Sequence, residues 1–152
     1  MSLNGSGLLY GSGTSLGPWI AYTPSVIGTG WAIGNGTITG SYSQIGKMVH
    51  FRVAITWGST STYGTAQLGI GTTPHGGTLA STPTANSNII DVVGYDTSAA
   101  TYYQLAGRWG TTANFNLFTI GTGGVMANVT NTAPFTWASG DFIWLAGCYE
   151  AA

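Results

Sequence analysis

Residues 48–57 read M-V-H-F-R-V-A-I-T-W, a strict alternation of apolar and more polar side chains. A period of two residues is typical of a β-strand with one face against a core and the other toward solvent. The face expected to be buried holds Val49, Phe51, Val53, Ile55 and Trp57. The opposite face holds Met48, His50, Arg52, Ala54 and Thr56. This stretch therefore predicts an all-β fold.

Further short strands are expected on both sides of this one, separated by Gly, Pro and Asn, and no window has a helical period. The expected strands span residues 18–24, 36–42, 66–70, 89–95, 102–109, 114–120, 125–130 and 141–150. Residues 71–87 are expected to form an extended surface loop. Strand spacing of this kind predicts a sandwich or barrel, and the long crossing loops favour a jelly-roll-like antiparallel β-sandwich over residues 18–152. Composition alone does not separate it from an immunoglobulin-like topology.

The sequence predicts the conformation of two turns. Gly46-Lys47 suits a tight turn that needs a positive φ angle, and in the stretch 138–141 Asp141 is expected to cap its own backbone before the last strand. Residues 1–17 show neither a strand nor a helix period and are rich in Gly and Ser. They are expected to form an extended N-terminal arm, with docking points at Leu3, Leu8, Leu9, Tyr10 and Leu16.

The chain is unusually poor in charge. Lys and Arg number 3, Asp and Glu number 4, and together they make up 5% of the residues, against about 25% in an ordinary domain. Nucleic acid and an anionic membrane surface are therefore excluded as expected partners, because both require clustered cations. No segment approaches the ~20 apolar residues of a membrane span. Since hydrophobic residues reach 43%, a core is expected. Low charge with so many apolar side chains also indicates that copies of the chain or other subunits cover much of its surface.

Two segments carry a family resemblance. Residues 31–57 include Gly40-Ser41-Tyr42, and residues 134–150 open with Pro134-Phe135-Thr136-Trp137. Both segments resemble the glycine-rich β-sandwich domains of tailed-phage virion proteins, found in tail fibres, minor tail proteins and capsid-surface (decoration) proteins. The resemblance implies a non-enzymatic structural component of the bacteriophage virion, commonly a homotrimer with a jelly-roll body. Residues 1–17 would then contact other virion proteins.

Candidate catalytic and metal-binding residues are few. Asp91 lies among apolar residues, and the favoured interpretation is an outward-facing strand position or a partner of Arg52 or Arg108. Asp91 and Asp96 could in principle serve as a glycosidase pair, a remote alternative. His50 and His75 lack companion ligands for a metal, although symmetry copies of one His or Asp meeting on a trimer axis remain an alternative. No catalytic, cofactor or metal site is therefore predicted, and a hydrolase acting on wall polymer is the least favoured function.

Cys148 is the single cysteine and is interpreted as a buried, inert thiol in the last strand. Aromatic residues supply the remaining candidates for a ligand site. One candidate patch consists of Tyr102, Tyr103, Trp109, Arg108 and Asn114, and Trp57 with Tyr63 bracket another. For any single Trp a place in the core or in a subunit interface is favoured. The alternative function is a carbohydrate-binding, lectin-like module at a fibre tip that binds a host-surface glycan.

Overall fold

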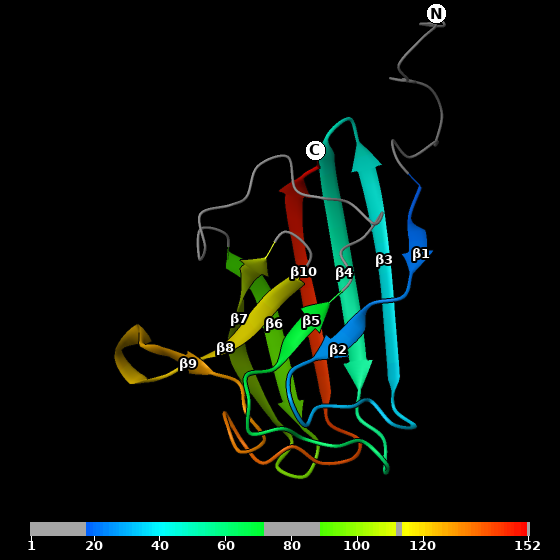
Figure 1. Ribbon diagram of the computed structural model, residues 1–152. Helices are drawn as coiled ribbons and strands as arrows, with labels where there is room; N and C mark the ends of the chain where they lie inside the picture. Colours follow the sequence, from blue (N-terminus) through cyan, green and yellow to red (C-terminus); the bar gives the residue numbers. More distant parts are fainter. Residues whose placement is uncertain (1–17, 72–88, 112–113, 152) are drawn as a thin grey trace, which may run out of the picture.

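The computed structural model describes residues 18–71, 89–111 and 114–151 (Figure 1). Within these residues the protein is all-β, with a single 3-10 turn, η2 (Thr122–Gly124), as the one helical element. The strands are β1 (Ile20–Tyr22), β2 (Ser25–Ile27), β3 (Thr37–Ile45), β4 (Met48–Thr56), β5 (Gly69–Gly71), β6 (Ile89–Asp96), β7 (Thr101–Thr111), β8 (Asn114–Ile120), β9 (Met126–Asn128) and β10 (Phe142–Glu150).

All strand pairs are antiparallel, and the strands form one curled sheet, a half-barrel, in the order β1-β3-β4-β10-β6-β7-β8-β5-β2. β9 pairs with β8 outside this path. β3 and β4 form a hairpin, and β6, β7 and β8 form a meander. β10 lies between these two units, paired with β4 over its whole length and with β6 over Phe142–Ala146. The last strand therefore joins the two halves of the sheet.

β1 and β2 lie at the two ends of this order, and only Thr23 and Pro24 separate them in the chain. β1 pairs with β3, whereas β2 pairs with β5. In Figure 1, β2 passes in front of β4, with its partner β5 beside it in front of β10. The bent segment from β1 to β2 therefore pairs with strands at both ends of the sheet order and holds the sheet in its curled form.

The core lies inside the curl and is largely aromatic. Phe51 on β4 contacts Phe115 on β8 with ring centroids 5.7 Å apart, and Trp109 on β7 lies 5.4 Å from Tyr149 on β10. A second cluster closes the end of the curl where the long connections lie, with Trp57 5.5 Å from Trp31 and 6.3 Å from Trp137. Burial of large aromatic side chains is the main favourable contribution to the stability of this fold.

The alternation of residues 48–57 is confirmed. Its apolar face is buried, with Val49, Phe51, Val53, Ile55 and Trp57 at most 3% exposed. Gly46 has a φ angle of 60°, and Asp141 accepts a 2.7 Å hydrogen bond from the backbone N–H of Ala138, so both turn predictions are also confirmed. The all-β, antiparallel character is confirmed as well. The jelly-roll topology, the homotrimer and the boundary at residue 17 stay predictions. Residues 1–17, and most of the loop expected at 71–87, lie outside the described residues.

Candidate functional site

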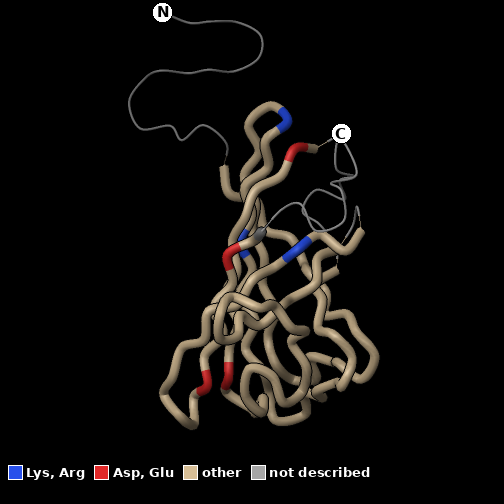
Figure 2. The backbone as a smooth tube through the Cα atoms, turned by 90° about the vertical axis from the view of Figure 1, so that its left-hand side faces the viewer, with Lys and Arg blue, Asp and Glu red and all other residues tan. Residues whose placement is uncertain are grey.

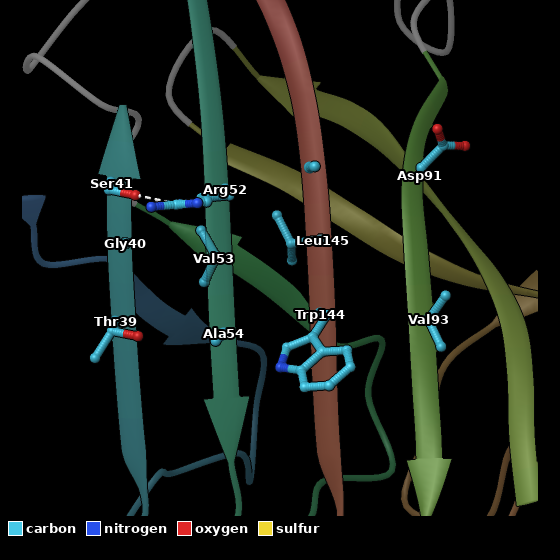
Figure 3. Close-up of a pocket in the computed structure, with 11 residues that line it drawn as sticks. Thr39, Gly40, Ser41, Arg52, Val53, Ala54, Asp91, Val93, Trp144 and Leu145 are labelled. Carbon is cyan, nitrogen blue, oxygen red and sulfur yellow. Dashed lines mark hydrogen bonds between the residues drawn. The ribbon is translucent and has the colours of Figure 1, made fainter. Parts of the chain in front are cut away.

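The candidate site lies on the face of the sheet that points away from the core, here called the outer face. The register of four neighbouring strands places Ser41, Arg52, Ala146 and Asp91 in one row across β3, β4, β10 and β6. Because successive side chains of a strand alternate between faces, all four point outward. Figure 3 shows Arg52 and Asp91 on opposite sides of β10.

A hollow of about 640 Å³ is centred on this row, here called the Trp144 hollow. Its lining includes Thr39, Ser41, Arg52, Asp91, Trp144 and Ala146. The side chains at its floor are small, because Ala146 on β10 and Ala54 on β4 leave the sheet uncovered between larger neighbours. Trp144 forms one wall, is 53% exposed, and presents the face of its indole ring to the viewer in Figure 3.

A second hollow of about 790 Å³ adjoins the first and shares Arg52, Asp91 and Ala146 with it. It continues toward the β3–β4 turn, where its lining includes Trp19, Met48, His50, Cys148 and Glu150. The two hollows therefore form one groove along β4 and β10. Four of the seven charged residues of the chain lie on this part of the outer face or at the turn above it, namely Lys47, Arg52, Asp91 and Glu150. Figure 2 shows how few charged positions the whole tube carries.

Arg52 is held in place from two sides. Its Nε donates a 2.7 Å hydrogen bond to Oγ of Ser41, and its guanidinium carbon lies 4.4 Å from the ring centroid of Trp19. A guanidinium stacked on an aromatic ring and tied by one nitrogen loses little further entropy when its other donors bind a ligand. Among the described residues, its two terminal amino groups have no hydrogen-bond acceptor. They remain available to a ligand.

Asp91 is exposed and makes neither a hydrogen bond nor an ion pair with any described residue. The predicted outward orientation is therefore confirmed, whereas the expected pairing with Arg52 or Arg108 is not formed. Since Arg52 and Asp91 both lie opposite Ala146, their backbones are two strand spacings apart, about 10 Å. The groove thus holds a donor and an acceptor of opposite charge that do not neutralise each other.

A row of four aromatic rings, here called the aromatic ladder, extends from Trp144 across three strands. Consecutive centroids are separated by 4.6 Å between Trp144 and Phe142, 4.7 Å between Phe142 and Tyr95, and 4.6 Å between Tyr95 and Tyr102. Tyr102 at the far end is 64% exposed. Cross-strand aromatic pairs stabilise a sheet, and here they also support the indole of Trp144 from the side opposite the hollow.

The structure presents neither aromatic patch predicted from the sequence as an exposed ligand surface. Tyr102 lies on the outer face, whereas Tyr103 and Trp109 lie on the inner face, because residues an odd number of positions apart in a strand point to opposite sides. Tyr103 packs on Phe135 at 4.7 Å, and Trp109 is buried in the core. Trp57 belongs to the core cluster, and the partly buried Tyr63 packs against it with ring centroids 5.5 Å apart. The interpretation of most Trp residues as core is confirmed for Trp31, Trp57, Trp109 and Trp137.

The prediction of a buried Cys148 is wrong, since its side chain is exposed opposite His50. The run 142–149 appeared uniformly apolar, but β10 is two-sided, with Ile143, Leu145 and Tyr149 inside and Trp144, Ala146 and Cys148 outside. The same alternation was the available signal for Trp144, which the sequence analysis did not single out. His75 lies outside the described residues. Over the described part of the chain, His, Cys, Asp and Glu form no group of three or more placed to bind a metal.

The remaining acids have structural roles. Asp141 is buried and accepts hydrogen bonds from the backbone N–H groups of Thr97 at 2.9 Å and Ala138 at 2.7 Å. Asp96 accepts bonds from the Ser98 hydroxyl at 2.7 Å and from the N–H of Ala99 at 2.9 Å, and these bonds lower the pKa of its carboxyl group. Asp91 and Asp96 lie five residues apart on one strand, about 17 Å, which exceeds the carboxyl separation that glycosidases use. This pair therefore does not have glycosidase geometry.

Comparison of the chain with protein-family models, with curated proteins and with solved structures gave no match. Within residues 18–71, 89–111 and 114–151, no helix combines the length and the hydropathy that crossing a bilayer requires.

Proposed function

We propose that this chain is a non-enzymatic structural protein of a bacteriophage virion, a tail fibre, minor tail or capsid decoration component that assembles as a homotrimer. Its body would be a jelly-roll-like β-sandwich, and residues 1–17 would attach it to other virion proteins. The proposal is supported by the all-β fold and by the resemblance of residues 31–57 and 134–150. It does not include a cofactor, a metal, nucleic acid or a membrane.

The observation that carries this proposal is an apolar surface at the β3–β4 turn. Ile45 and Met48 face each other across this turn and are both exposed, and Trp19 lines the same end of the groove. Lys47 is the one cation at the turn itself. Exposed apolar side chains gathered at one end of a sheet are typical of a subunit interface, and a second copy of this chain is the proposed occupant. Glu150, which pairs across the strands with Met48, lies beside this surface.

The test is the mass of the protein in dilute solution, measured by light scattering after size-exclusion chromatography. We expect three times the chain mass of 15.6 kDa. Met48→Glu places a second carboxylate opposite Glu150 inside the proposed interface and should release the monomer, because buried, unpaired carboxylates are strongly unfavourable. Val125→Glu is the matched control, since Val125 is exposed between η2 and β9 and should leave the mass unchanged. A monomeric wild type, or equal dissociation of both variants, would contradict the proposal.

Glycan recognition is the second candidate function, and the Trp144 hollow favours it. Proteins bind sugars with an exposed aromatic face beside hydrogen-bonding side chains, since a pyranose has apolar C–H faces and a polar rim. The hollow adjoins the apolar surface at the β3–β4 turn, because both parts of the groove share Arg52, Asp91 and Ala146. Assembly and recognition would therefore use adjoining parts of one face of the sheet.

A further inference from the structure

We infer that the Trp144 hollow is a binding site for a neutral oligosaccharide, with Trp144 as its stacking platform and with Arg52 and Asp91 as its two polar contacts. This inference deepens the second candidate function and rests on it. It does not depend on the trimer. Three features of the hollow determine the chemistry of the ligand: a flat apolar wall, a floor of small residues, and an unpaired donor and acceptor on opposite sides.

The apolar wall is the indole of Trp144. A half-exposed Trp on a sheet face is costly in water unless a ligand or partner covers it. Its position is fixed by contact with Phe142 at 4.6 Å, and Phe142 in turn stacks on Tyr95 at 18° between ring planes. A platform supported in this way loses little conformational freedom on binding. It suits a flat ligand with an apolar face, as a pyranose ring has.

The polar contacts require a ligand with both donors and acceptors. Arg52 supplies N–H donors, Asp91 supplies acceptors, and the hydroxyl groups of Ser41 and Thr39 line the same hollow. Each sugar hydroxyl donates and accepts, so neighbouring hydroxyls satisfy both sides at once. The two strand spacings between Arg52 and Asp91, about 10 Å, are wider than a single small ligand needs. An oligosaccharide spans this width, with Ala146 and Ala54 below it.

The charge balance points to a neutral chain of sugars. On this part of the outer face Arg52 is balanced by Asp91, and Lys47 at the turn is balanced by Glu150. A polyanion such as a sulfated or sialylated glycan would bury the carboxylate of Asp91 beside another negative charge, which is unfavourable. A protein partner would instead need matching charges at both positions, because charges are depleted from the centres of protein interfaces. Neutral hydroxyls meet neither difficulty.

The experiment uses the full chain on a microarray of neutral, sialylated and sulfated oligosaccharides, including bacterial surface polysaccharides. The strongest neutral glycan is then titrated in solution while tryptophan fluorescence is recorded. We expect neutral glycans to bind, and Trp144→Ala to weaken binding about tenfold or more. Trp144→Phe retains a ring and should restore most of the affinity. Asp91→Asn and Arg52→Ala should each weaken binding, whereas Ile120→Ala, an exposed apolar position on β8, should not.

Thermal melting of each variant separates loss of the site from loss of the fold, and light scattering on the same samples reports assembly. Binding only to sialylated or sulfated glycans, or no binding to any glycan, would overturn the inference. If Trp144→Ala dissociates the oligomer and the wild type binds no glycan, this face is a protein interface. That result would also overturn the inference. A monomer that binds neutral glycan through Trp144 would overturn the assembly proposal and leave this inference standing.

Discussion

At the scale of single residues, two aspartates differ in burial and in hydrogen bonding. Asp141 is 1% exposed and satisfies two backbone N–H groups, whereas Asp91 is exposed and bonds to no described residue. Asp141→Ala should therefore lower the free energy of unfolding by about 2–3 kcal/mol, since it leaves the N–H groups of Thr97 and Ala138 without their charged acceptor. Asp91→Ala is the matched control and should change it by less than about 0.5 kcal/mol. Equilibrium denaturation by urea compares the two, and equal losses would contradict the assignment.

Buried tyrosines make a second prediction at this scale. Burial, with a smaller contribution from Tyr42, raises the pKa of Tyr149 from 10.0 to about 12, and burial together with Tyr149 raises the pKa of Tyr22 above its ordinary range. Because the pKa of Tyr149 is higher in the folded than in the unfolded state, its contribution to the free energy of unfolding is complete below pH 10. This contribution is lost as the pH rises through about 12. Tyr149→Phe should make the melting temperature less sensitive to pH across this window. A variant with the wild-type alkaline slope would show that Tyr149 does not contribute.

At the scale of elements, the contact between β1 and β3 depends on one glycine. A Cβ atom at Gly40 would lie 2.5 Å from the ring of Tyr22 and 2.8 Å from Pro24. Gly40→Ala should therefore displace β1 from β3 and destabilise the fold by about 1–3 kcal/mol, the usual cost of overpacking. Gly46→Asn is the control, because Asn tolerates its positive φ and a Cβ there meets nothing within 4 Å. Denaturant unfolding measures both, and a neutral Gly40→Ala would show that β1 adapts.

Much at this scale was predictable from the sequence. The two-residue period gave the buried face of β4, and β6, β8 and β10 begin within a residue of the expected positions. The short β5 lies at Gly69–Gly71 rather than over residues 66–70, because its backbone pairing with β2 and β8 defines it and its side chains carry no period. Local patterns report which face of a strand is buried. They do not report which strand lies beside it.

At the scale of the whole molecule, this limit explains why the candidate site was missed. Arg52 and Asp91 were both singled out from the sequence, but they share a hollow only because β10 lies between β4 and β6. Nothing in the residues around either one encodes this insertion. Trp144 joins them for the same reason, since it is carried on the inserted strand. A site built across strands far apart in sequence becomes visible only once the sheet order is known.

The central place of β10 also has a consequence for biosynthesis. The ribosome synthesises the β3–β4 hairpin and the β6–β7–β8 meander before residues 142–150. Until β10 is present, the edges of β4 and β6 that pair with it both lack a neighbouring strand. The sheet can therefore be completed only after β10 has been synthesised, and this one step closes both gaps together. During that interval the nascent protein is most exposed to strand exchange with sister chains, which makes this the stage at which chaperones would matter most.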